Sequence, residues 1–124
     1  MAGRGIDGFV VETRNWGKTA AFWQQLGYTI DFETDHNSGR LSHPEGGPFI
    51  FVVERPEGPE PEMYPIIGAD DANTFVAPAA GSVEHAFEPR HWDVVEMMLL
   101  DPDGRHLSVQ APLPEGVEAP AGHH

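Results

Sequence analysis

The chain has 124 residues, with twenty acidic and seven basic side chains, a formal net charge of −13 and no cysteine. This length suits a single domain, the acidic charge argues against nucleic acid as a partner, and the lack of cysteine excludes disulfides and thiolate metal sites. The longest apolar run, Phe49 to Val53, is far shorter than the roughly 20 residues that cross a bilayer, so no membrane partner is expected.

The N-terminal half of the chain has the pattern of a βαβββ module. Its first residues lack the apolar core of a secretory signal, which predicts a cytoplasmic location. Residues 6–13 are β-rich and predict a strand. A helix is expected next, because Asn15 can cap its start, Gly27 can end it, and apolar residues recur between them at helical spacing. Further strands are predicted at residues 28–32, 39–42 and 49–54.

The C-terminal half follows a linker at residues 55–62, which is too rich in proline to join a central strand. A strand at 63–68 and a short helix at 70–77, which an aspartate can cap, are predicted next. The remaining strands are expected at residues 83–87, 94–100 and 105–111. Residues 112–124 lack periodicity and are rich in proline, glycine and alanine, which predicts a disordered tail.

Two short motifs support a family resemblance. The sequence FWQQLGY closes the first helix at residues 22–28, and DPDGR joins the last two strands at residues 101–105. In this order, within two βαβββ patterns, they resemble the vicinal oxygen chelate superfamily, which includes glyoxalase I, bleomycin-resistance proteins, extradiol dioxygenases and fosfomycin-resistance enzymes. The resemblance covers residues 6–111 as one domain, with halves at 6–54 and 63–111.

This resemblance implies an α+β fold in which the two modules form a cupped mixed sheet around a cavity, with the helices on its outer face. It also implies a homodimer, since many members build the cavity from two chains. Enzymes of the superfamily usually hold a divalent metal with His, Glu or Gln side chains on inward-facing strands. The corresponding positions here are Gly8 or Asp7, Phe51 or its neighbours, Tyr64 or Pro65, and Ser108. Most of these are poor metal ligands, so we expect no metal and no cofactor.

The histidines give little support for a different metal site. His36, His43, His85, His91 and His106 are scattered without the spacing that brings two ligands onto one face of an element. Only His106 is suggestive, because strand alternation places it with Ser108 and Gln110, opposite Leu107 and Val109. We expect the face that carries His106 to line the cavity.

Two glutamates are candidates for the same cavity. Alternation groups Glu12 with Gly8 and Val10, while Phe9 and Val11 face the helix. Glu96 shares a face with Met98 and Leu100, and the sequence leaves open whether that face points inward. If they point inward, the two carboxylates could hold a cation or an amine, or act as a general base. The alternative is that they are exposed on a solvated strand.

Aromatic residues complete the candidate site. Phe51, Tyr64 and Trp92 fall on strands or strand edges where a planar ligand could stack, whereas Trp16 and Trp23 have helical spacing and suit a core or a dimer contact. No catalytic residue is predicted. The predicted ligand-binding residues are Glu12, Phe51, Tyr64, Trp92, Glu96, Met98, His106, Ser108 and Gln110.

These observations leave three functions open. The first is a metal-independent binding protein, similar to the bleomycin-resistance branch, that sequesters an aromatic or cationic small molecule. The second is a metal-dependent lyase, isomerase or dioxygenase whose metal is held by displaced groups such as Asp7, Glu12, Glu96 and His106. The third is a scaffold that has lost its chemistry. We favour the first and expect a binding protein rather than an enzyme, because poor ligands at the metal positions argue against metal chemistry.

Overall fold

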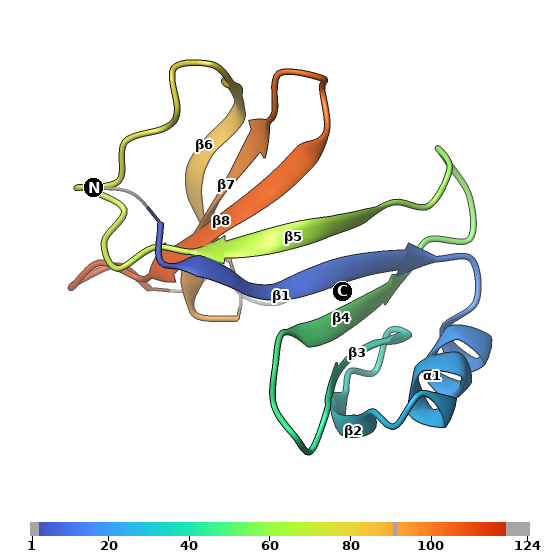
Figure 1. The fold of residues 1–124 in the computed structure, drawn as a ribbon. Helices are drawn as coiled ribbons and strands as arrows, with labels where there is room; N and C mark the ends of the chain where they lie inside the picture. Colours follow the sequence, from blue (N-terminus) through green and yellow to red (C-terminus); the bar gives the residue numbers. More distant parts are fainter. Residues whose placement is uncertain (1–2, 91, 119–124) are drawn as a thin grey trace. The chain divides into compact units, whose positions relative to one another are not determined.

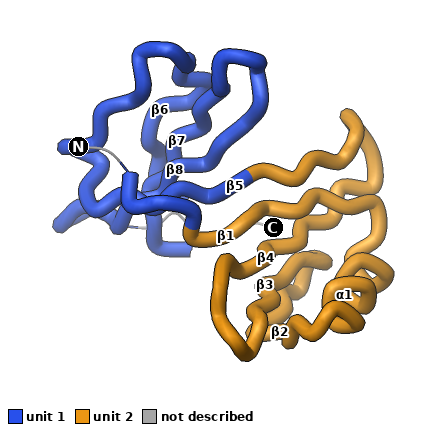
Figure 2. Tube along the Cα trace, in the orientation of Figure 1, with its two compact units in different colours: residues 1–6, 65–123 blue, residues 7–64, 124 orange. Residues whose placement is uncertain are grey.

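The computed structural model describes residues 3–90 and 92–118. The α+β class is confirmed, because the described chain contains one helix and eight strands of mixed β-sheet (Figure 1). The contacts divide these residues into an N-terminal unit, residues 7–64, and a C-terminal unit, residues 3–6 and 65–118 (Figure 2). The elements are β1 (Gly5–Thr13), α1 (Trp16–Gln25), β2 (Thr29–Glu33), β3 (Ser38–Ser42), β4 (Phe49–Glu54), β5 (Met63–Gly68), β6 (Ser82–Arg90), β7 (Val94–Leu100) and β8 (His106–Pro112).

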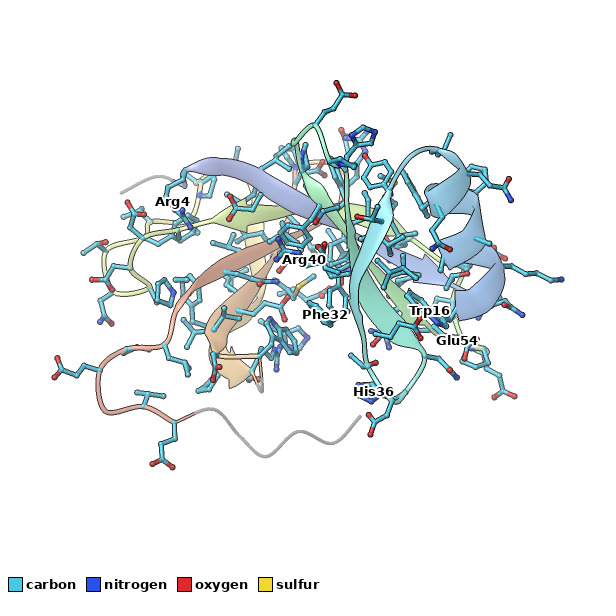
Figure 3. All side chains as sticks on the ribbon, turned by 90° about the horizontal axis from the view of Figure 1, so that it is seen from below. Arg4, Trp16, Phe32, His36, Arg40 and Glu54 are labelled. Atoms are coloured by element: carbon cyan, nitrogen blue, oxygen red, sulfur yellow. The ribbon has the colours of Figure 1, made fainter. Side chains whose placement is uncertain are left out.

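The N-terminal unit is the predicted βαβββ module. Its strands lie in the order β2-β3-β4-β1, with β1 parallel to β4 and the other pairs antiparallel. Helix α1 begins where expected, because the Asn15 side chain accepts a hydrogen bond from the Lys18 amide at 3.0 Å. The carboxylate of Glu54 accepts a second one from the Trp16 amide, and both residues are labelled in Figure 3. A strand end therefore fixes where the helix starts.

Helix α1 covers the core of this unit. Leu41, Ile50 and Val52 are buried on one face of the strands, and Trp16 and Trp23 pack against them. Phe9 and Val11 lie on this same face, as strand alternation predicted, together with Tyr28 and Ile30. Of the two alternatives predicted for Trp16 and Trp23, the core contact is confirmed. The opposite face of the strands is left for other contacts.

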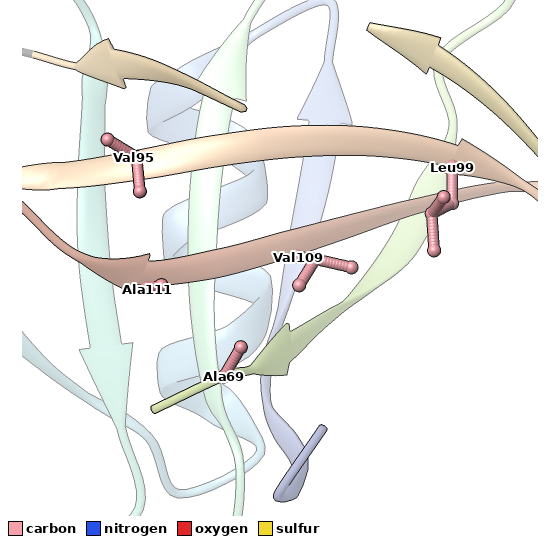
Figure 4. Close-up of a cluster of buried hydrophobic side chains, with 5 residues drawn as sticks. All are labelled: Ala69, Val95, Leu99, Val109 and Ala111. Atoms are coloured by element: carbon pink, nitrogen blue, oxygen red, sulfur yellow. The ribbon is translucent and has the colours of Figure 1, made fainter. Parts of the chain in front are cut away.

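The C-terminal unit has strand order β5-β8-β7-β6, with β5 parallel to β8. Its core consists of Ala69, Val95, Leu99, Val109 and Ala111 (Figure 4). The helix predicted at residues 70–77 is wrong: only a turn forms at 72–74, where the Phe75 amide donates to the Asp71 carbonyl at 3.1 Å. The stretch Asn73–Val76 holds poor helix formers and Pro78 follows, so too few residues remain to propagate a helix.

Two segments outside the strands are anchored to the units. The proline-rich linker has no strand or helix, and the Arg14 guanidinium donates hydrogen bonds to the carbonyl oxygens of Arg55, Gly58 and Pro59. After β8, Leu113 packs against the core of the C-terminal unit. The rest of the predicted tail from residue 119, with His123 and His124, lies outside the described residues, as does His91. Within the described ranges, no helix has the length and hydropathy that a bilayer crossing requires.

Candidate ligand-binding site

Most of the predicted site residues lie together on one face of β7 and β8. Antiparallel pairing sets Glu96 opposite Gln110, Met98 opposite Ser108, and Leu100 opposite His106. Cross-strand partners point to the same side of a sheet, and the buried core residues of these strands alternate with them. Glu96 therefore lies on the strand face opposite the core, with His106, Ser108 and Gln110.

The carboxylate of Glu96 is the centre of this face. Glu96 is only 8 % exposed, and its Oε1 accepts a hydrogen bond from the Arg90 guanidinium Nε at 2.9 Å. Its Oε2 accepts one from the Ser108 hydroxyl at 2.6 Å and a longer one from the Gln110 side-chain amide at 3.4 Å. A buried carboxylate needs such compensation, since an unpaired charge at this burial is costly.

The hydrogen bonds continue from Glu96 to an exposed aromatic ring. The fully buried Ser108 hydroxyl accepts a hydrogen bond from the Gln110 amide nitrogen at 3.1 Å. The Gln110 oxygen in turn accepts one from the Trp92 indole Nε1 at 3.4 Å, and Trp92 is 46 % exposed. A connected polar network thus reaches from a buried ion pair to a ring that solvent can reach.

The edge strand β6 adds further charged groups to this face. The His106 ring nitrogen Nε2 lies 3.3 Å from the Glu84 carboxylate. The exposed carboxylate of Glu88 lies 3.4 Å from the Arg90 guanidinium, beside the Glu96 pair. Two exposed carboxylates therefore lie near the network, which already balances the charge of Glu96 with that of Arg90.

In the N-terminal unit, the predicted residues Glu12 and Phe51 lie on the strand face opposite α1. Glu12 is paired with the Arg55 guanidinium at 2.7 Å, and its other oxygen accepts a hydrogen bond from the Glu62 amide at 3.1 Å. Alternation along β1 places Asp7 on the opposite face, with Phe9 and Val11, so Asp7 and Glu12 do not share a site. Tyr64, on β5, is half-buried.

Rings fill the space beside Gly8 on this same face. A Cβ atom added at Gly8 would lie 2.7 Å from both the ring and the backbone carbonyl oxygen of Phe49, so a side chain there would displace the ring and strain the strand. The Arg40 guanidinium lies over that ring, 4.2 Å from its centroid, and the Phe51 and Phe32 ring centroids lie 6.2 Å apart. Arg40 and Phe32 are labelled in Figure 3. Only glycine fits at position 8 because both the ring and the backbone carbonyl oxygen of Phe49 occupy the space.

Gly8 and Ser108, two of the positions that the resemblance assigns to metal ligands, do not fit a divalent ion, and neither does the displaced candidate Glu96. Gly8 offers no donor and no room for one, and the Ser108 hydroxyl is engaged with Glu96. The Glu96 oxygens accept three hydrogen bonds, one of them from a guanidinium whose charge would repel a metal ion. Across residues 3–90 and 92–118, no group of three or more His, Cys, Asp or Glu side chains is arranged to hold a metal.

Sequence reasoning missed two residues that shape these faces, Arg90 and Phe49. The strand predicted at 83–87 was too short: β6 runs to Arg90, and Pro89 pairs with Val95 within it. Proline is tolerated there because β6 is the outermost strand of its unit. The sequence placed Phe49 on a strand, but it did not show that Phe49 pairs with Gly8, and this pairing puts the Phe49 ring in the space beside Gly8.

Comparisons with solved structures support the fold. A glyoxalase/bleomycin resistance protein/dioxygenase superfamily member from Vibrio splendidus 12B01 matches with a TM-score of 0.63 at 16% identity, over 84% of this chain and 96% of that one. Methylmalonyl-CoA epimerase from Mycobacterium tuberculosis matches with a TM-score of 0.65 at 11% identity, over 91% of each chain.

A third match is a glyoxalase I variant from Zea mays, with a TM-score of 0.60 at 17% identity, over 93% of this chain and 44% of that one. No protein-family model matches the chain, and neither does any curated protein sequence. The resemblance to the vicinal oxygen chelate superfamily is therefore confirmed at the level of the fold, and identities this low carry no information on the ligand.

Proposed function

We propose that this chain is a small-molecule-binding protein that needs no metal and holds an aromatic or cationic ligand on the β6-β7-β8 face. One observation carries the proposal: Arg90, Ser108 and Gln110 donate hydrogen bonds to the carboxylate of Glu96, one of the displaced groups that could otherwise hold a metal. A guanidinium bound to the carboxylate supplies the positive charge that a metal would otherwise provide. The face is left to recognise ligands by stacking and charge.

The exposed groups of this face favour a planar cation. The Trp92 indole presents the aromatic surface that attracts cations most strongly. The Glu84 and Glu88 carboxylates lie near the same face, and their side chains are 37 % and 61 % exposed. The chain's net charge of −13 would attract a cation further, in a way that salt screens.

A thermal-shift titration with the planar aromatic cation proflavine, in the presence of a chelator, tests this proposal. The wild-type chain should be stabilised by mass action, and the Trp92→Ala variant should lose most of that stabilisation. The control is Val76→Ala, which removes an exposed apolar side chain outside β6, β7 and β8 and should bind like wild type. No shift with proflavine, or equal shifts in wild type and Trp92→Ala, would contradict the proposal.

The proposal includes the homodimer that the resemblance implies. Phe22 and Leu26 are both more than half exposed at the C-terminal end of α1, which provides apolar surface for a second copy to cover. Light scattering coupled to gel filtration should give twice the chain mass, and a Phe22→Glu, Leu26→Glu variant should give the monomer mass. A monomeric wild type would remove the dimer from the proposal but leave ligand binding untouched.

A further inference from the structure

We infer that Ser108, Gln110 and Arg90 are positioning residues, which together fix the plane of the Trp92 indole as a platform for a planar ring. This inference rests on the proposed function, because it explains how the same face would recognise its ligand. It goes further by assigning the recognition to one ring and its orientation to a buried charge.

The Glu96 carboxylate sets the direction of every hydrogen bond that follows. A carboxylate paired with a guanidinium can only accept hydrogen bonds, so the Ser108 hydroxyl must use its single proton to donate to Glu96. The Ser108 oxygen can then only accept from its other neighbour. Gln110 therefore turns its NH2 group toward Ser108 and Glu96.

With its NH2 group committed, Gln110 has one orientation left for its carbonyl oxygen. That oxygen faces the indole, and the Trp92 Nε1 group, which can only donate, bonds to it at 3.4 Å. Each group in the series thus has its donor or acceptor role fixed by the one before it. The orientation of an exposed ring is specified by a charge buried beneath it.

The backbone around Trp92 is held from both sides. Trp92 lies in the turn between β6 and β7, where the Asp93 amide donates to the Arg90 carbonyl at 3.2 Å and Asp93 adopts a φ of 66°. Arg90 is tied to Glu96 and Trp92 to Gln110, and these two partners face each other across β7 and β8. Positive φ is unfavourable for a residue other than glycine, so these two ties help to hold the turn in one conformation.

A ring held in this way binds more tightly than a mobile one. Ordering a side chain on binding costs about 0.5–1.5 kcal/mol, and an indole that is already ordered avoids that cost. The expected ligand class is a planar aromatic ring that can stack face to face on the indole. Releasing the indole from Gln110 should therefore weaken binding by about 3- to 10-fold without removing the stacking surface.

Fluorine NMR of the chain labelled with 5-fluorotryptophan tests the inference. The chain has three tryptophans, and the resonance of Trp92 is identified by its loss in Trp92→Phe. In Gln110→Met and in Ser108→Ala, the Trp92 resonance should move and sharpen, and the Kd for proflavine should rise about 3- to 10-fold. Gln24→Met changes an exposed glutamine on α1 and should alter neither the resonance nor the Kd.

Ser108→Ala is the more discriminating variant, because it removes one oxygen from the middle of the network and leaves Gln110 and Trp92 in place. If Gln110→Met fails to fold, Ser108→Ala alone decides. An unchanged Trp92 resonance and an unchanged Kd in Ser108→Ala would overturn the inference. If instead Trp92→Ala itself binds proflavine like wild type, the proposed function fails at this face, whatever the NMR spectra show.

Discussion

The two units cover their cores by different means. In the N-terminal unit, a capped helix brings Trp16 and Trp23 onto the strands, and Leu41 beneath them is 0 % exposed. In the C-terminal unit, the irregular segment that replaces the second helix supplies Phe75 and other partly buried residues, and Leu99 stays 7 % exposed. A hollow of about 150 Å³ lies beside Leu99. An irregular segment with a few apolar side chains can therefore cover a core in place of a helix, but it packs against that core less tightly.

The units also differ in how they bind a glutamate on the strand face that points away from the core. Glu12 receives its hydrogen bonds from the linker, and its partner Arg55 is 58 % exposed in its side chain. Glu96 receives its hydrogen bonds from β6 and β8, and the side chain of its partner Arg90 is 29 % exposed. Donors on paired strands move less than donors on a loop, so the pair in the C-terminal unit is the more rigid of the two.

Matched leucine truncations should produce the largest effects and measure the difference between the two cores. Leu41→Ala should lower the free energy of unfolding by about 3–5 kcal/mol, because the fully enclosed site cannot collapse around the cavity. Leu99→Ala should cost about 2–3 kcal/mol, since the irregular segment can relax into the space. Urea denaturation monitored by circular dichroism gives both values, and a larger loss for Leu99→Ala would reverse the ranking of the two cores.

Removing each glutamate compares the two ion pairs. Glu96→Ala leaves Ser108 and Gln110 without their acceptor and should cost about 2–3 kcal/mol. Glu12→Ala should cost about 1 kcal/mol or less, because Arg55 and the linker amide can turn to water. The same denaturation experiment measures both variants. Equal losses would mean that strand and loop donors contribute alike.

Much of the fold could be predicted, because hydrophobic alternation and turn residues are local signals. The bounds of β4, β5 and β7 match the predicted ranges, and the cap at Asn15 located α1. The helix predicted at residues 70–77 does not form, because an N-terminal cap cannot stabilise a helix whose following residues are poor helix formers. The candidate site was predictable only in part: alternation grouped His106, Ser108 and Gln110, but the pairing of Arg90 with Glu96 depends on register across strands, which no local signal reveals.

Among the residues that the structure describes, each unit contains one residue other than glycine with positive φ in a turn, and replacing each by glycine compares the backbone strain of the two units. Asn37 has φ 60° and Asp93 has φ 66°, a region that glycine adopts without strain. Asp93→Gly should raise stability by about 0.5 kcal/mol. Asn37→Gly should gain less, because the Asn37 side chain also donates to Glu54 at 2.8 Å. Thermal denaturation should rank Asp93→Gly above Asn37→Gly, and the opposite order would show that strain at position 93 is negligible.

The turn between β7 and β8 should make the stability of the C-terminal unit depend weakly on pH in the acid range. The Arg105 backbone amide, with help from its side chain and from the Asp103 amide, holds the pKa of the Asp101 carboxyl below its usual value. The ionised form of Asp101 is therefore favoured in the folded state. Its contribution to folding stability is complete above the ordinary aspartate pKa and is lost as the pH falls through the lowered pKa of the folded state.

Replacing Asp101 by asparagine tests this dependence. The difference in Tm between wild type and Asp101→Asn should shrink as the pH is lowered below roughly 4, the usual range for an aspartate. Asp103→Asn is the matched control, because the exposed Asp103 side chain has only a longer contact with Arg105. A difference in Tm that stays constant down to pH 2 would rule out this contribution.

The most direct test of the account is a metal titration of the chain without His123 and His124. Equilibrium dialysis against Zn²⁺, Mn²⁺, Ni²⁺ and Fe²⁺, followed by elemental analysis, should leave far less than one ion per chain, because Glu96 is already bound by Arg90, Ser108 and Gln110. One tightly held ion per chain, lost in Glu96→Gln, would contradict it and move the assignment to a metal-dependent enzyme.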